Sequence, residues 1–254
     1  MRHFLYSYQT NVTFSSPIYN HSFKLRCRPY INVHQQIADE HFTISPNCWV
    51  TDGTDAFGNR TIVGGYYQHH FSFGYISSGI VSQKEVELKR VETNLPLYLF
   101  PTSLTMPTSE LNGLDVPAGN VFDKAEFIAH WVHDFLEYTP GITHSSSTVS
   151  DVMQVRKGVC QDFSHVMLAA CRLNNIPARY VCGMMLGEGE THAWVEVSDG
   201  KIWKAYDPTN DNFAEYGYVK LSQGRDARDC SVCNGMFVGN AVQKTDVTVS
   251  VFEV

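Results

Sequence analysis

The residue types and spacing that could do chemistry begin at Cys160. This cysteine follows Gly158-Val159 and opens an apolar-periodic segment that predicts a helix. Its sulfur should therefore lie among the unpaired N–H groups and the positive dipole end of that helix. Such a position favours the thiolate, which is the form of cysteine that attacks carbonyl carbons. A cysteine without partners is more often a small buried hydrophobe, and four others are interpreted in that way: Cys27, Cys48, Cys171 and Cys182.

A histidine and an aspartate downstream supply the partners of the thiol. Asp199-Gly200 separates two alternating runs and predicts a tight hairpin turn. Counting outward from this turn places His192 opposite Asp207, with their Cβ atoms about 5 Å apart. A carboxylate in that position fixes the imidazole tautomer and leaves the other ring nitrogen to take a proton from sulfur. The sequence therefore predicts a catalytic triad of Cys160, His192 and Asp207.

The elements that must position this triad change in character along the chain. Alternating runs predict β-strands in the first part: Phe4 to Phe14, Ser22 to Val33, His41 to Val50 and Thr61 to Tyr75. A hairpin loop is predicted at Thr51–Asn59, and a proline-rich connection at Leu95–Asn120. Helices are then predicted over 123–137, 148–156 and 160–176, the first with Asp123 and Glu126 as a capping box. Strands are predicted over 178–183, 192–197, 201–206 and 247–254.

This order of elements predicts an α+β protein with two domains. A β-sandwich-like domain is expected at 1–95 and a linker at 96–118. A papain-like α+β core is expected at 119–254, including the C-terminal strand. The position of that last strand in the fold is left open.

Composition narrows the class of protein. The 254 residues carry a net charge of −7 without a Lys/Arg cluster, which argues against nucleic-acid binding. No window approaches the roughly 18 apolar residues of a membrane-spanning helix. The polar, alternating start of the chain does not resemble a signal peptide, and seven cysteines are an odd number that fits a reducing compartment. A cytoplasmic protein is therefore expected, and its oligomeric state is left open.

Several segments, in order and spacing, resemble the motifs of bacterial transglutaminase-like proteins of the cysteine-protease group: Gly158–His165, Ile176–Val181, His192–Glu196 and Asp207–Asn210. The resemblance extends to Gly224-Arg225-Asp226, to Asp229, Gly235 and Gly239, and to the β-rich N-terminal part. It implies a papain-like core with the cysteine on a helix and the histidine and aspartate on a sheet. One departure is Cys230-Ser231-Val232-Cys233, a single C-x-x-C without further zinc ligands. Neither a metal nor another cofactor is expected.

Two further residues are candidates near the triad. Trp194 lies on the same predicted strand face as His192, where it is either a wall of the cleft or a core residue. Gln154 lies six residues before Cys160, the offset at which papain-type proteases place an oxyanion donor, but within a predicted helix, which favours coincidence. Arg225 and Asp226 either form an ion pair that braces the site or close a turn.

These residues predict cleavage of an amide bond, in a peptide or an isopeptide, through a thioacyl intermediate. Acyl transfer to an amine uses the same triad and remains open. Two other classes also remain, a non-catalytic peptide-binding module and a deglycosylating amidase, although the latter lacks its expected zinc cysteines. A peptide or protein substrate is expected. Glu188 and Glu190, in the loop before His192, suggest either a cationic ligand or a solvated loop.

Overall fold

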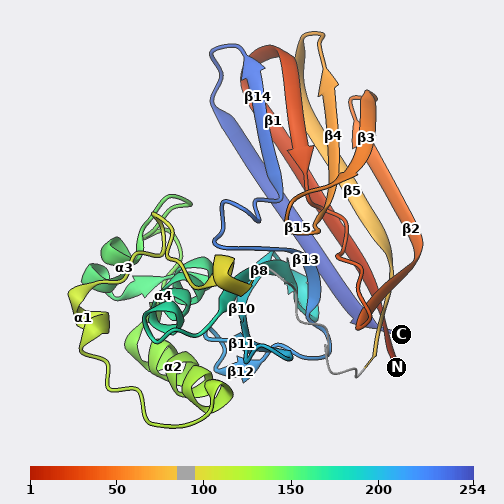
Figure 1. The fold of residues 1–254 in the computed structure, drawn as a ribbon. Helices are drawn as coiled ribbons and strands as arrows, with labels where there is room; N and C mark the ends of the chain where they lie inside the picture. The colour runs from red at the N-terminus through yellow and green to blue at the C-terminus, as the bar shows by residue number, and fades with distance from the viewer. Residues whose placement is uncertain (85–94) are drawn as a thin grey trace.

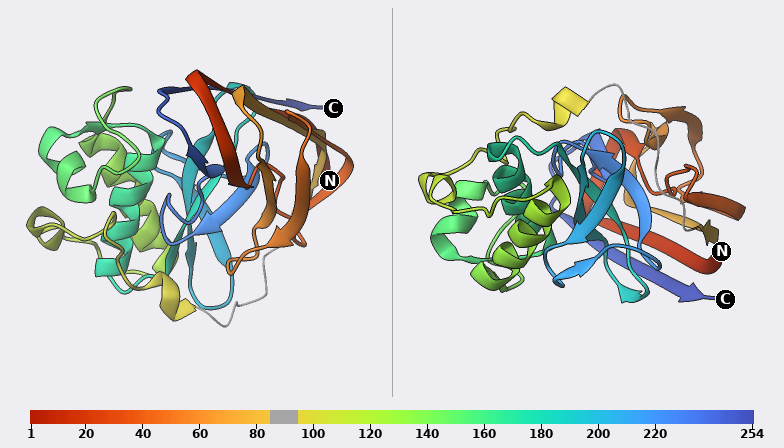
Figure 2. Two further views of the ribbon diagram at one scale, coloured as in Figure 1. Left: turned by 90° about the horizontal axis from the view of Figure 1, so that it is seen from above. Right: turned by 60° about the horizontal axis from the view of Figure 1, so that its bottom comes forward.

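The computed structural model describes residues 1–84 and 95–254 and contains two groups of elements. An eight-stranded antiparallel sheet combines strands from both ends of the chain, and a five-stranded sheet in the second half carries the helices (Figure 1). The helices lie on one side of the five-stranded sheet, and the N-terminal strands lie on the other (Figure 2).

Strand β1 (Arg2–Leu25) organises the larger sheet because it pairs along two successive stretches. Its first stretch pairs antiparallel with β5 (His70–Gln83) and β15 (Gln243–Glu253). After a register shift, its second stretch pairs with β4 (Arg60–Tyr66) and β14 (Cys233–Val238). The remaining strands of this sheet are β2 (Gln35–Ser45), β3 (Trp49–Thr54) and β9 (Gly187–Gly189).

The N-terminal part is β-rich as predicted, but several strand boundaries differ. The strand predicted from Ser22 ends at Leu25, where β1 leaves the sheet. The strand predicted at Thr61–Tyr75 is two strands, β4 and β5, with a break at residues 67–69. The run His41–Val50 is interrupted by a turn at Ser45-Pro46, because proline cannot donate a ladder hydrogen bond. The alternation of apolar and polar residues does not by itself reveal a short turn that joins two strands.

The C-terminal strand belongs to the N-terminal sheet. Strand β15 pairs with β1 from Phe4–Glu253 to Phe14–Gln243. The expected division into 1–95, 96–118 and 119–254 stays a prediction, and its first boundary adjoins residues 85–94, which lie outside the described residues. The two sheets also share a core, since Met184, Val219 and Leu221 of the second half pack among the buried residues of β1 and β5.

The five-stranded sheet has the order β12-β11-β10-β8-β13. Its strands are β8 (Ala178–Met184), β10 (His192–Ser198), β11 (Trp203–Asp207), β12 (Asn212–Phe213) and β13 (Val219–Gly224). The helices are η1 (Leu95–Tyr98), α1 (Ser109–Asn112), α2 (Val121–Phe135), α3 (Val149–Val155) and α4 (Cys160–Leu173). Two short strands, β6 (Glu137–Tyr138) and β7 (Lys157–Gly158), pair in parallel just before α4.

Helix α2 begins two residues before the predicted start. Its N-cap is Asn120, whose side chain accepts hydrogen bonds from the N–H groups of Phe122 and Asp123. Asp123 is therefore the N3 residue of a capping box and not the N-cap, so the predicted box with Glu126 is wrong. Asparagine is as good an N-cap as aspartate, and the sequence pattern fits both starts.

Candidate active site

Cys160 is the first residue of α4, as predicted, and the turn before it is held by Asp162. The buried Asp162 carboxylate accepts the Val159 N–H at 2.8 Å and the Thr143 hydroxyl at 2.6 Å. In the described part of the chain, neither the Cys160 N–H nor the Gln161 N–H donates to a backbone or side-chain acceptor. The sulfur is half-buried beside these free donors, which suit a developing negative charge.

His192 connects the thiol to a buried carboxylate. Its Nε2 lies 2.7 Å from Oδ2 of Asp207, and the exposed fractions of the two side chains are 12% and 0%. A side-chain hydrogen bond also links His192 to Cys160. Because Asp207 holds Nε2, the other ring nitrogen, Nδ1, is the one that faces sulfur. The structure thus brings the three predicted residues together.

Asp207 carries more hydrogen bonds than the sequence indicates. Its Oδ2 also accepts from Asn210 Nδ2 at 2.7 Å and from the Tyr218 hydroxyl at 2.9 Å. Its Oδ1 accepts the backbone N–H groups of Thr209 and Asn210 at 2.9 and 3.3 Å. Burial raises the pKa of Asp207, but His192, Asn210 and Tyr218 outweigh burial and lower it. The aspartate is therefore a fixed anion beside the imidazole.

The same network sets the charge of His192. Burial lowers the pKa of His192, but the hydrogen bonds and charges of Asp207 and Cys160 outweigh it and raise the pKa to about 9. The imidazole is consequently protonated at neutral pH. An imidazolium beside a cysteine sulfur is the arrangement that supports a thiolate nucleophile.

The predicted pairing of His192 with Asp207 is confirmed at the level of side chains, but the predicted register is wrong. Ser198 lies opposite Trp203, not Lys201, because the turn contains four residues, from Asp199 to Ile202, and not two. The Asp199 carboxylate accepts the N–H groups of Lys201 and Ile202 and so stabilises this wider turn. Since strand faces alternate with a period of two, Asp207 stays on the His192 face and reaches the ring diagonally.

Cys160 and His192 line a cavity of about 600 Å³. Its walls come from the segments around Tyr138, from the loop after β8 and from β9, and they include Glu188 and Glu190. No lysine or arginine of the described residues lines it. Gln154 is exposed on α3 and is absent from this lining, so the structure does not bring it to the sulfur.

Trp194 is a core residue and not a wall of the cavity. Its exposed fraction is 2%, and its ring packs edge-on against Tyr218 with centroids 5.4 Å apart. A Cβ at Gly183 would lie only 2.4 Å from the Trp194 indole, so glycine is needed there. Trp194 thereby positions the phenol that binds Asp207. The sequence contains no signal that assigns this role to Tyr218.

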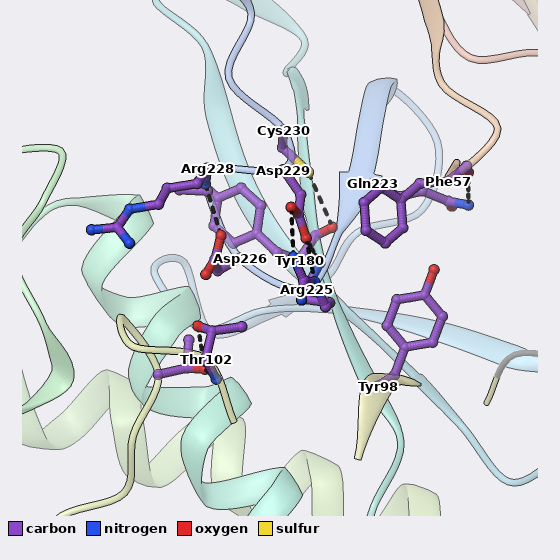
Figure 3. Close-up of polar contacts among 12 residues, drawn as sticks. Phe57, Tyr98, Thr102, Tyr180, Gln223, Arg225, Asp226, Arg228, Asp229 and Cys230 are labelled. Carbon is purple, nitrogen blue, oxygen red and sulfur yellow. Dashed lines mark hydrogen bonds and ion pairs between the residues drawn. The ribbon is translucent and has the colours of Figure 1, made fainter. Parts of the chain in front are cut away.

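The loop after β13 is fixed by contacts that the sequence did not reveal. Arg225 pairs with Asp229 at 2.8 Å, and Asp226 accepts the backbone N–H of Arg228, so the alternative of a closed turn is correct and the Arg225–Asp226 pair is not (Figure 3). His165 of α4 is fully buried and accepts the Ala227 N–H at 3.1 Å. Burial lowers the pKa of His165 to about 4, which keeps its ring neutral.

The described residues contain no group of three or more His, Cys, Asp or Glu side chains arranged to hold a metal ion. All seven cysteines are free thiols; Cys230 is buried and Cys233 is exposed. Among the helices described, none has the length and apolar character needed to cross a membrane.

Comparison with known proteins assigns the family. Residues 111–208 match the transglutaminase-like superfamily model, and residues 5–82 match the bacterial transglutaminase-like N-terminal region. The chain thus combines a transglutaminase-like core with a bacterial transglutaminase-like N-terminal region. A proposed cysteine protease from Cytophaga hutchinsonii has a similar structure, with a TM-score of 0.84, 25% identity, and coverage of 100% of this chain and 91% of that one.

The transglutaminase-like chain is also similar to mycobacterial proteins of uncharacterised function. An uncharacterised protein of Mycobacterium leprae is 36% identical over 133 residues, or 48% of this chain and 47% of that protein. One of Mycobacterium tuberculosis is 33% identical over 177 residues, or 63% of this chain and 56% of that protein. The chain thus spans about half the length of the curated relatives it matches.

Proposed function

We propose that this transglutaminase-like protein is a cysteine-nucleophile enzyme that cleaves an amide bond, in a peptide or an isopeptide, through a thioacyl intermediate. One observation carries the proposal: a cysteine at a helix start is hydrogen-bonded to an imidazole whose other nitrogen lies 2.7 Å from a buried aspartate. An idle cysteine would not need a protonated imidazole held by a buried carboxylate with four other donors.

The reaction proceeds in two steps at Cys160 and His192. The thiolate attacks the amide carbon, the carbon–nitrogen bond breaks, and His192 gives its proton to the leaving nitrogen. Water then attacks the thioacyl carbon, gives a proton to His192 and releases the acid and the thiolate. An amine in place of water would give acyl transfer. The product, a new amide instead of a free acid, distinguishes acyl transfer from hydrolysis.

The oxyanion of each step needs donors close to sulfur. The Cys160 N–H is one, because it is free in the described residues. The second is the Tyr138 hydroxyl. Tyr138 lines the same cavity and pairs through β6 with Gly158, two residues before the nucleophile. Burial and the charges of Cys160 and Glu190 raise the pKa of Tyr138, so the phenol remains a hydrogen-bond donor at neutral pH.

The test is covalent trapping combined with turnover. Peptide substrates should leave an acyl group on the Cys160 peptide, detected by mass, and turnover should vanish in Cys160→Ala but not in Cys48→Ala. Cys48 is a half-buried cysteine of the N-terminal sheet region and serves as the matched control. Equal iodoacetamide labelling of all accessible cysteines, without Cys160-dependent turnover, would contradict the proposal and favour a binding module.

We further propose a cytoplasmic location and a polypeptide substrate. The support for the first is the presence of seven free cysteines in a protein of ordinary composition. Fractionation of cells with an antibody against the chain tests it, and recovery outside the cytoplasm would overturn it.

A further inference from the structure

A second cavity, of about 450 Å³, adjoins the one that contains Cys160. Gln161, Tyr180, Cys182 and Thr191 line both cavities, so the two lie side by side, and together they are called the groove below. Each cavity alone has the volume of an ordinary ligand site. Together they offer an elongated site and not a single round pocket.

One wall of this groove is a face of strand β15. Thr245 and Val247 line the second cavity, and Val249, two residues further, lines the cavity of Cys160. These residues lie on one face because side chains alternate along a strand, and they span about 14 Å at about 3.4 Å per residue. The neighbouring strand extends this wall, since Thr10 pairs with Val247 and also lines the second cavity.

The opposite wall is preorganised. Asp229 accepts the backbone N–H and the guanidinium of Arg225, and Arg26 donates to the carbonyl oxygen of Ser231 at 3.0 Å. Figure 3 shows this loop beside Tyr180, with the Arg228 guanidinium directed away from the Tyr180 ring. Arg228 bonds Ser103 at 2.9 Å and is the one charged residue among those that line the second cavity in the described structure.

This lining identifies the chemistry of the occupant. It combines valine side chains and aromatic rings with uncharged hydroxyl and amide groups, which suits a polypeptide main chain better than a compact charged molecule. The length of the β15 face matches about four residues of extended chain.

We propose that the groove along Thr245, Val247 and Val249 binds an extended segment of a polypeptide substrate and leads its scissile amide to Cys160. The proposal rests on the proposed function and gives the N-terminal sheet a role, because β15 and β1 belong to that sheet. The recognised feature is about four residues of extended peptide, and not one side chain.

The dependence of kcat/KM on peptide length tests whether the groove binds an extended segment of the substrate. For random-sequence peptide pools of two, four and six residues, kcat/KM should rise about tenfold or more with length in the wild type. Thr245→Trp fills the second cavity and should reduce this gain to about twofold, while the iodoacetamide reaction of Cys160 stays unchanged. Asp246→Trp is the matched control, because its side chain lies on the other face of β15.

Binding to Cys160→Ala separates this proposal from the proposed function. A fluorescent six-residue pool should bind this variant about tenfold more weakly once Thr245→Trp is added, whether or not the wild type cleaves peptides. The proposal would be overturned if kcat/KM of Thr245→Trp rose with peptide length as much as in the wild type. It would also be overturned if Cys160→Ala bound the six-residue pool equally well with and without Thr245→Trp. A length effect seen with glycopeptides and absent with plain peptides would instead assign the groove to a glycan.

Discussion

Replacing Asp207 by asparagine tests the network at the centre of the site. Five hydrogen-bond donors face the carboxylate, three at Oδ2 and two at Oδ1. An asparagine side chain has one acceptor oxygen, and its NH₂ group must face donors in either orientation. The Asp207→Asn variant therefore loses at least two hydrogen bonds and the charge that holds the imidazolium.

The expected loss of stability is large for a single isosteric substitution such as Asp207→Asn. Hydrogen bonds to charged groups contribute roughly 1.5–3 kcal/mol each, and breaking a buried ion pair costs about 3–5 kcal/mol, so the free energy of unfolding should fall by about 3–5 kcal/mol. The pKa of His192 should fall from about 9 to its ordinary value of about 6.5 or below. At about pH 7.5 the imidazolium population then drops at least about tenfold.

The assay is mass-resolved iodoacetamide labelling of Cys160 across pH, together with urea denaturation. Labelling of Asp207→Asn at about pH 7.5 should be at least about tenfold slower than in the wild type. The control is Asp199→Asn, which changes an exposed turn carboxylate that accepts two backbone N–H groups. Wild-type labelling and stability in Asp207→Asn would refute the ion-pair reasoning.

Three other predictions address the same site. Tyr138→Phe should lower amide turnover about 100-fold but leave alkylation by iodoacetamide unchanged, because alkylation develops no oxyanion; slower alkylation would point to a structural role. Tyr218→Phe should lower the free energy of unfolding by about 1.5–3 kcal/mol, measured in urea, because it removes one hydrogen bond to a buried anion. Because folding raises the pKa of His192, its protonation adds to the free energy of unfolding. This contribution is fully present below about pH 6.5 and is lost as pH rises through about 9. Urea denaturation across that interval should show a loss of about 3 kcal/mol that is absent in His192→Gln, and an identical pH dependence in both proteins would contradict the assignment.

The grouping of Cys160, His192 and Asp207 could be predicted from sequence because the position of each residue depends on local rules. Cys160 follows a turn and opens a periodic helix, and that position alone exposes its backbone N–H. His192 and Asp207 flank a single hairpin, so a two-residue period keeps them on one face even though the turn is longer than predicted. A register error of two residues leaves each side chain on the same face of the sheet, because side chains alternate with a period of two.

The supporting residues could not be predicted, because they depend on tertiary pairing. Tyr218 reaches Asp207 from the start of β13, which pairs with β8 at the far edge of the sheet. His165 is one of several apolar-face positions of α4, and only the returning loop at Ala227 identifies its acceptor role. The alternation of β15 predicted a strand, but not its pairing with β1.

The location of β15 explains why the triad and the groove differ in what they require. All three triad residues lie on α4 and one hairpin, whose buried side chains form a core of their own with α2 and α3. The groove needs β15, which is held in place by its ladder with β1, its pairing with β9 and its packing against β8. A disturbance of the N-terminal sheet should therefore weaken recognition of long peptides before it affects the reactivity of Cys160. This separation is what makes Thr245→Trp informative, because it changes the proposed recognition surface on an element that holds none of the three proposed catalytic residues.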